Sequence, residues 1–264
     1  MFSVATAPVH RSGPCEPALT TNGRSLPALW RHFRSALPTP EWCEGADRWL
    51  LVVLAHVPRW TGLLDSCKEL LERQQLEKIL RHRFALDRQG LIVAYALHRM
   101  VLAAAMRRPL AEVHLTRNRM GAPEVLDCPD WHTSLSHAGA FVAIGVTGQG
   151  PIGVDIEPLT RAREMPEIAA SVKAQGELQT VHEEIALLKL WVRKEALLKA
   201  EGVGLSRPMR DFHAPANTPI ASISEPGTWL QLHEPDAGGQ LALAVAGPAR
   251  LSPRVAWLSP RPET

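Results

Sequence analysis

Two carboxylates stand two residues apart in the segment GVDIEPL, residues 153–159. Its apolar, β-branched residues are typical of a strand, and side chains alternate between the two faces of a strand. Asp155 and Glu157 therefore share one face, about 7 Å apart at about 3.3 Å per residue. Like charges this close repel unless a cation, a base or open water lies between them. The pair either surrounds such a group or lies on the solvated side of an edge strand.

A second segment has the signals of a long helix: TVHEEIALLKLWVRKEALLKAEGVGL, residues 180–205. Thr180 and Glu183 have the spacing of a capping box, and Gly202 and Gly204 follow the last apolar residues as a stop. We therefore expect a helix of about twenty residues, about 30 Å long at 1.5 Å per residue.

Glu195 lies on the apolar side of this predicted helix, four residues after Trp191 and three before Leu198. A carboxylate on a buried face needs a partner, because burying an isolated charge is costly. One possible partner is Lys199, four residues later, in an ion pair that is common on exposed helices. The other possibility is that Glu195 joins the two strand carboxylates around a divalent cation.

Three carboxylates without His or Cys in the pattern favour a hard cation. Mg²⁺ usually keeps several waters and takes its remaining ligands from substrate phosphates. Lys194 and Lys199 could neutralise phosphate oxygens beside it. Because phosphoryl transfer needs little more than a metal ion, cations and a positioned nucleophile, the pattern indicates phosphate chemistry.

The elements that must position these residues follow a partly repeated order. Apolar strand candidates and amphipathic helices run as strand, helices and strands, and then in the same order again. This order predicts an α+β fold of two similar halves packed side by side. The predicted units are an irregular N-terminal arm at 1–46, a first half at 47–150, a second half with the metal site at 151–250, and a Pro-rich tail at 251–264.

Composition and charge argue against several classes of protein. The 264 residues carry a formal net charge of +2, which is too small for a face that wraps nucleic acid. The longest apolar runs, WLLVVLA and LIVAYAL, are too short to span a membrane. The four cysteines form no CxxC pair, which favours free thiols in a reducing compartment. We therefore expect a cytoplasmic monomer that binds neither nucleic acid nor membrane.

The strand and helix motifs together resemble the paired signature of the 4′-phosphopantetheinyl transferases, of the Sfp-like type. GVDIEPL is followed about forty residues later by LWVRKEALLKAEGVGL, and SLSHAGAFVAIGV resembles the Ser-His segment of that family. The resemblance implies two similar α+β halves with coenzyme A in the cleft between them. It also implies transfer of the 4′-phosphopantetheine arm to a serine of an acyl or peptidyl carrier protein, with release of adenosine 3′,5′-bisphosphate. Such carriers serve polyketide, nonribosomal peptide and fatty acid biosynthesis.

The same resemblance assigns roles to individual residues. Asp155, Glu157 and Glu195 resemble the Mg²⁺ ligands that hold the coenzyme A pyrophosphate, and Glu195 or a water that it orients resembles the base toward the carrier serine. Lys199 resembles the catalytic lysine that binds phosphate. Glu177 stands where the family often has another acid. The residues assigned to coenzyme A binding are His137, Ser136, Lys194, Arg83 and Arg88, although the two arginines also fit a solvated charge cluster.

One departure from the family pattern concerns a phosphate cation. The segment RNRMGAPEVL stands where the family has a Gly-Lys-Pro turn, and Ala122 replaces the lysine. This change slightly favours an alternative in which the protein binds coenzyme A or a carrier protein without turnover, whereas the presence of all three acids of the metal site argues against it. A different Mg²⁺-dependent phosphotransferase is a second alternative, but the chain has neither a GxxxxGK nor a GxGxxG loop.

Overall fold

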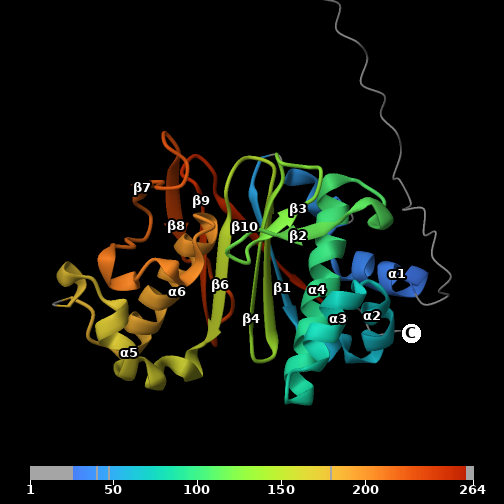
Figure 1. The fold of residues 1–264 in the computed structure, drawn as a ribbon, viewed down its shortest axis with the longest axis horizontal. Coiled ribbons are helices and arrows are strands. Elements are labelled where there is room, and N and C mark those ends of the chain that lie inside the picture. Colours follow the sequence, from blue (N-terminus) through green and yellow to red (C-terminus); the bar gives the residue numbers. More distant parts are fainter. Residues whose placement is uncertain (1–25, 40, 47, 179, 260–264) are drawn as a thin grey trace, which may run out of the picture.

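The computed structural model describes residues 26–39, 41–46, 48–178 and 180–259, and two four-stranded sheets lie at its centre (Figure 1). A separate two-stranded hairpin stands beside them. The first sheet has the order β10-β1-β5-β4, in which β1 pairs with β10 in parallel and with β5 antiparallel. Its strands are β1 (Leu50–His56), β4 (His132–Ala138), β5 (Phe141–Thr147) and β10 (Pro253–Leu258).

The second sheet is antiparallel, with the order β6-β9-β8-β7. It leaves β6 as an edge strand. Its strands are β6 (Gly153–Pro158), β7 (Pro219–Ala221), β8 (Trp229–His233) and β9 (Leu241–Pro248), and the hairpin consists of β2 (Leu115–Arg117) and β3 (Pro123–Val125).

Helices cover the outer faces of the two sheets (Figure 1). The α-helices are α1 (Leu26–Ala36), α2 (Leu64–Glu69), α3 (Arg73–Leu80), α4 (Ala85–Met106), α5 (Met165–Val172) and α6 (Glu184–Ala200). Short 3₁₀ turns lie at Trp42–Gly45, Val57–Leu63, Leu110–Glu112, Leu159–Glu164, Gln175–Glu177, Gly204–Ser206 and Met209–Asp211.

Strand alternation divides the interior into three apolar layers. In β1, Leu51 and Val53 pack into a cluster with the residues of α4, whereas Val52 and Leu54 face the second sheet. In β9, Ala244 packs into the cluster of α6, and its neighbours face the first sheet. The layers therefore run helix, sheet, sheet, helix, which confirms a mixed α+β class.

The predicted strands and the long helix are confirmed, but three expectations at their ends are wrong. The predicted irregular arm contains α1, whose apolar residues Leu29 and Phe33 are fully buried. The predicted tail contains β10, which extends the first sheet beside β1. Helix α6 begins with Glu183 as N-cap and without a side-chain cap, so the expected capping box of Thr180 does not form. The two glycines do end α6, with φ of +66° at Gly202.

Helix α4 corrects the expectation that no apolar run could span a membrane. The run LIVAYAL lies inside α4, which has the length and the composition of a membrane-crossing helix. In this structure 78% of its most apolar window is buried inside the protein. The helix packs between the first sheet and α1, α2 and α3, and its hydropathy is that of a core helix (Figure 1).

Gly153 at the start of β6 lets α6 approach the second sheet. A Cβ atom there would lie 1.9 Å from the Ala196 carbonyl oxygen and 2.5 Å from the Ala200 nitrogen, both of which are backbone atoms of α6. We expect Gly153→Ala to lower the free energy of unfolding by about 3 kcal/mol, because the helix must move to admit the methyl group. Urea unfolding tests this.

Gly62 offers a matched control, because a Cβ at that position would have nothing within 4 Å. Gly62→Ala should change the free energy of unfolding by less than about 0.5 kcal/mol. An equally small effect of Gly153→Ala would contradict the close helix packing described here.

Candidate active site

The two carboxylates of β6 share one buried face, as the sequence predicts. Val154 and Ile156 pack between the two sheets, so Asp155 and Glu157 point to the opposite side, toward α6. Asp155 is 4% exposed and Glu157 is 6% exposed. The exposed edge-strand alternative is therefore wrong, because both acids are removed from water and need partners within the protein.

Asp155 is held by groups from the first sheet and from α6. Lys199 Nζ lies 2.7 Å from Asp155 Oδ1 and 3.1 Å from the Val154 carbonyl oxygen. Ser136 of β4 donates its hydroxyl to the same carboxylate oxygen over 2.7 Å, and Ser134 Oγ accepts the Val154 N–H over 3.0 Å. These side chains satisfy the open edge of β6 and fix the position of its carboxylate.

Glu157 has a cationic partner on the turn that follows β6. Arg161 Nη1 donates to Glu157 Oε1 over 2.7 Å, and the guanidinium carbon lies 5.3 Å from the centroid of the Trp191 ring. Burial raises the pKa of Glu157, although Arg161 acts in the opposite direction. Trp191 of the helix motif thus packs beside the cluster of α6 and orients an arginine.

Glu195 joins this group electrostatically. Its pKa is raised from 4.5 to about 7, first by burial and then by the negative charge of Asp155. Glu157 adds to the effect, and Lys199 opposes it. Because Lys199 is four residues after Glu195, the two share one side of α6, and both face the carboxylates of β6. The structure therefore brings together the three predicted metal ligands and the predicted catalytic lysine.

A cavity of about 280 Å³ opens beside Lys199. His137 lines it from β4, and burial together with the charge of Lys199 lowers the pKa of His137, although much of this residue is exposed. Ser136 does not line this cavity, and its hydroxyl is directed at Asp155. The other lining residues come from α4, β4, the β2–β3 hairpin and the segment after α6, and include Tyr95, His98, Arg117, Met120, Ala122, Ser134, Gly202 and Gly204.

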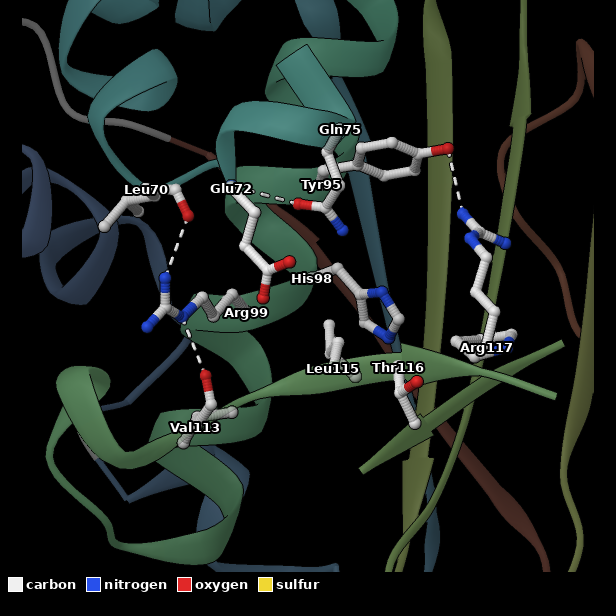
Figure 2. A pocket seen from close by; sticks show the side chains of 11 residues that line it. Leu70, Glu72, Gln75, Tyr95, His98, Arg99, Val113, Leu115, Thr116 and Arg117 are labelled. Atoms are coloured by element: carbon white, nitrogen blue, oxygen red, sulfur yellow. Dashed lines mark hydrogen bonds between the residues drawn. The ribbon is translucent and has the colours of Figure 1, made fainter. Parts of the chain in front are cut away.

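His98 projects from α4 toward the hairpin, as Figure 2 shows, and is 2% exposed. Its Nε2 lies 2.6 Å from Thr133 Oγ1, which itself donates to the Gly145 carbonyl oxygen over 2.9 Å. The Thr133 hydroxyl therefore accepts the Nε2–H of a neutral imidazole. Burial lowers the pKa of His98 to about 3, so this histidine stays neutral at physiological pH.

Lys194, which we predicted to bind coenzyme A, lies elsewhere. Its side chain is fully buried, with Nζ 2.5 Å from Glu177 Oε2 and 2.8 to 2.9 Å from three backbone carbonyl oxygens. Glu177, the further acid of the family pattern, is thus paired with Lys194 rather than placed with the β6 carboxylates. Successive helix residues lie about 100° apart, so Lys194 and Glu195 cannot face the same site.

The two predicted arginines lie on the turn before α4. Arg88 donates to the carbonyl oxygens of His82 and Arg83, and Arg83 stacks on Phe84 at 5.4 Å. Neither arginine lines the cavity beside Lys199. A neighbouring cavity of about 540 Å³ is instead lined by Lys78, His82, Arg117 and His137 among others. Arg88 fixes the turn that carries His82 into the wall of this cavity.

Comparison with known proteins shows which family this chain is similar to. The sequence profile of the 4′-phosphopantetheinyl transferase superfamily matches residues 151–246, which include β6 and α6. The chain is 27% identical to the 4′-phosphopantetheinyl transferases ffp of Bacillus subtilis, over 70% of this chain and 86% of the relative, and Sfp of Bacillus subtilis strain 168, over 66% and 82%. A phosphopantetheinyl transferase of Thraustochytrium is 26% identical over 80% of this chain and 83% of the relative. These matches confirm the resemblance of this chain to the 4′-phosphopantetheinyl transferase superfamily.

The carboxylates of β6 have room for one more partner. Asp155 Oδ2 and Glu157 Oε2 are buried and accept no hydrogen bond, although the other oxygen of each carboxylate is paired. In the described part of the chain, no three His, Cys, Asp or Glu side chains are close enough to form a ready-made metal site. The two carboxylate oxygens that accept no hydrogen bond nevertheless fit Mg²⁺, because this ion needs only one or two carboxylates from the protein.

The raised pKa of Glu195 predicts that the stability of the metal-free protein depends on pH. Below about pH 4.5 the carboxyl is protonated in the folded and unfolded states. Between pH 4.5 and 7 only the folded state keeps the proton, so stability falls as pH rises through this window. Glu195→Gln removes this loss of stability, because glutamine does not ionise. Since solvent screening weakens the effect, we expect the free energy of unfolding of the variant to exceed that of wild type by about 1–2 kcal/mol at pH 8.

Urea unfolding in EDTA, at pH 5 and pH 8, measures this effect. The advantage of Glu195→Gln should be small at pH 5 and full at pH 8. A variant that is less stable than wild type at pH 8 would show that Glu195 is not a source of repulsion beside Asp155.

The sequence did not lead us to some residues of the site. Ser134 and Arg161 hold the β6 segment, and Arg117 lines the cavity, yet none was singled out. Arg161 could have been found, because it is four residues after Glu157. Ser134 could have been found by strand alternation, because it is two residues before Ser136.

Proposed function

We propose that this protein transfers the 4′-phosphopantetheine group from coenzyme A to a serine of an acyl or peptidyl carrier protein, in a Mg²⁺-dependent reaction that releases adenosine 3′,5′-bisphosphate. The observation that carries this proposal is the convergence of Asp155, Glu157, Glu195 and Lys199 beside a cavity. Similarity to the superfamily supports it, since the named relatives are phosphopantetheinyl transferases. Polyketide, nonribosomal peptide and fatty acid synthases contain such carriers.

We further propose that the two sheets with their helices are the two similar halves, and that coenzyme A binds between them. The cavity beside Lys199 supports this placement, because Tyr95 and His137 come from elements of the first sheet and its helices, and Lys199 comes from α6. A volume of about 280 Å³ is at the lower end of the range for small-molecule sites, and the neighbouring cavity of about 540 Å³ extends it.

Asp155, Glu157 and Glu195 would hold Mg²⁺, using the carboxylate oxygens that accept no hydrogen bond in this structure. When bound there, Mg²⁺ would neutralise and orient the diphosphate of coenzyme A. The protein itself supplies Lys199, whose ammonium group can contact a phosphate oxygen while Asp155 keeps it in position.

The chemical step joins the serine oxygen to the phosphorus that carries the pantetheine arm. The bond from this phosphorus to the oxygen shared with the adenosine-side phosphate breaks, and that oxygen leaves with adenosine 3′,5′-bisphosphate. The proton of the serine hydroxyl goes to Glu195 or to a water that Glu195 orients. A carboxyl with a pKa of about 7 is matched to proton transfer near neutral pH.

A mass spectrum of an apo carrier protein tests the proposal. The carrier is incubated with this protein, coenzyme A and Mg²⁺, beside a sample with EDTA. We expect a gain of one phosphopantetheine group, about 340 Da from its composition, that is absent with EDTA. Acyl carriers and peptidyl carriers are tested in parallel, which also indicates the pathway.

The absence of any gain would favour the alternative of a binding module without turnover. In that case coenzyme A should still bind in calorimetry, and carrier proteins of both kinds should remain unmodified. A gain that persists in EDTA would contradict the role of the three carboxylates as Mg²⁺ ligands.

A further inference from the structure

The turn between α3 and α4 carries a group of exposed apolar side chains. Leu80 at the end of α3 is 56% exposed, Phe84 is 61% exposed, and Leu86 in the first turn of α4 is 78% exposed. The values for Leu86 and Phe84 are the highest of any large apolar side chain in the described part of the chain. Single exposed apolar residues are normal, but three within seven residues form a patch of the kind that marks a contact surface. We call these three side chains the α3–α4 patch.

The backbone that carries the α3–α4 patch is fixed by hydrogen bonds. Arg88 Nη1 donates to the carbonyl oxygens of His82 and Arg83, over 2.8 and 3.1 Å. The Arg88 N–H donates to the Phe84 carbonyl oxygen over 3.2 Å, and the guanidinium carbon of Arg83 lies 5.4 Å from the centroid of the Phe84 ring. The patch therefore has a defined shape before any partner binds, which lowers the entropy lost on binding.

The same turn concentrates positive charge. From Lys78 to Arg88 the segment KILRHRFALDR has four cationic residues and one acid, which gives a net charge of +3 with histidine neutral. The whole chain has a net charge of only +2. Apolar side chains surrounded by charged ones are typical of protein interfaces, and a cationic rim is complementary to an acidic partner.

The α3–α4 patch borders the candidate active site. His82 lines the cavity of about 540 Å³ together with His137, and His137 also lines the cavity beside Lys199. Figure 1 shows the start of α4 at the same end of the molecule as the C-terminal end of β6, where Glu157 lies. A protein that brings a serine to Lys199 must approach over this rim, whereas a membrane bound at the patch would obstruct that approach. The position therefore favours a protein partner over a membrane.

Resting on the proposed function, we propose that the α3–α4 patch is a docking surface for an acidic carrier protein. Leu80, Phe84 and Leu86 pack against an apolar face of the carrier, and Arg81 and Arg83 pair with carboxylates around that face. The patch is separate from the carboxylates of β6 and from Lys199. It therefore determines the affinity for the carrier protein and leaves the affinity for coenzyme A unchanged.

Carrier binding without turnover tests this inference. Isothermal calorimetry in the absence of coenzyme A measures the Kd of apo acyl and apo peptidyl carrier proteins for wild type, for Leu80→Ser combined with Leu86→Ser, for Arg81→Glu and for the control Ile223→Ser. Ile223 is 53% exposed, which is close to the value for Leu80, but it lies in the link between β7 and β8 of the second sheet. Equal melting temperatures show that the variants are folded.

The double leucine variant should raise the Kd for the carrier by about 10- to 100-fold, because it removes the apolar centre of the interface. Arg81→Glu should raise this Kd at least about threefold at low salt and less at high salt, since salt screens the charge pairs. Ile223→Ser should stay within about twofold of wild type, and so should the Kd for coenzyme A in all variants. In the transfer assay the double leucine variant should raise KM for the carrier and leave kcat within about twofold.

Unchanged carrier affinity in the double leucine variant would overturn the inference, and so would the absence of carrier binding to wild type. An equal loss of affinity for coenzyme A would assign the patch to the substrate cavity instead. If the variant lost binding to phosphatidylglycerol vesicles but kept its carrier affinity, the patch would be a membrane contact. A carrier that binds through the patch but is never modified would refute the proposed transfer and support the docking surface, because the calorimetry does not depend on turnover.

Discussion

Asp155→Asn is expected to lower the rate of carrier modification by at least about 10³-fold. The amide retains an oxygen that can accept from Ser136 and Lys199, so the hydrogen bonds that position β6 are preserved while one negative charge is removed. Loss of a metal ligand and of its charge removes several kcal/mol of transition-state stabilisation, and about 4 kcal/mol corresponds to a 10³-fold change. Initial rates measured by mass spectrometry over a range of Mg²⁺ concentrations give the value.

Ser136→Ala is the control for this experiment. It removes the 2.7 Å hydrogen bond to Asp155 but leaves the carboxylate charge and its contact with Lys199. We expect it to cost less than about tenfold in rate, because a single hydrogen bond contributes about 1 kcal/mol. If Asp155→Asn retains activity within tenfold of wild type, the β6 carboxylates are not the metal site. If Ser136→Ala loses as much as Asp155→Asn, the hydroxyl has a part in the reaction itself.

The local arrangement of the site follows from periodicity. The alternation of β6 places Asp155 and Glu157 on one face, and the four-residue spacing of Glu195 and Lys199 places both on one side of α6. Sequence reasoning could therefore predict which residues converge. These residues meet because α6 approaches β6 closely at Gly153. This backbone contact joins segments about forty residues apart, and no local pattern of the sequence indicates it.

The errors concern contacts that join distant parts of the chain. Strand β10 pairs in parallel with β1, about two hundred residues earlier, although its neighbourhood is rich in proline and was predicted as a tail. Arg117 enters the cavity only because the hairpin folds back against α4, where Tyr95 meets it (Figure 2). Local composition does not indicate a parallel strand pair that is separated by many residues, nor a hydrogen bond between a hairpin and a helix.

Lys194 shows how a motif can mislead when its residues are read as one site. It adjoins Glu195 in the sequence, but it points into the cluster between α6, α5 and the segment after α6, where its ammonium group contacts Glu177 and the carbonyl oxygens of Val172, Met209 and Phe212. A charged group with no exposed surface is tolerated only with such a complete set of acceptors. The lysine of the motif therefore fixes α6 relative to α5.

Lys194→Met should accordingly lower the free energy of unfolding by about 3–5 kcal/mol, because it leaves Glu177 and three carbonyl groups without their cation. Neutralising the orphaned acid as well, in Lys194→Met with Glu177→Gln, should recover part of this loss. Lys189→Met on the exposed side of the same helix should change stability by less than about 0.5 kcal/mol. Urea unfolding of the four proteins measures these differences, and calorimetry should find coenzyme A binding unchanged in the folded Lys194→Met protein. A residue enclosed between α5 and α6 can weaken ligand binding only by disturbing the fold. If Lys194→Met lowered the affinity for coenzyme A tenfold without lowering the free energy of unfolding, Lys194 would therefore belong to the phosphate site.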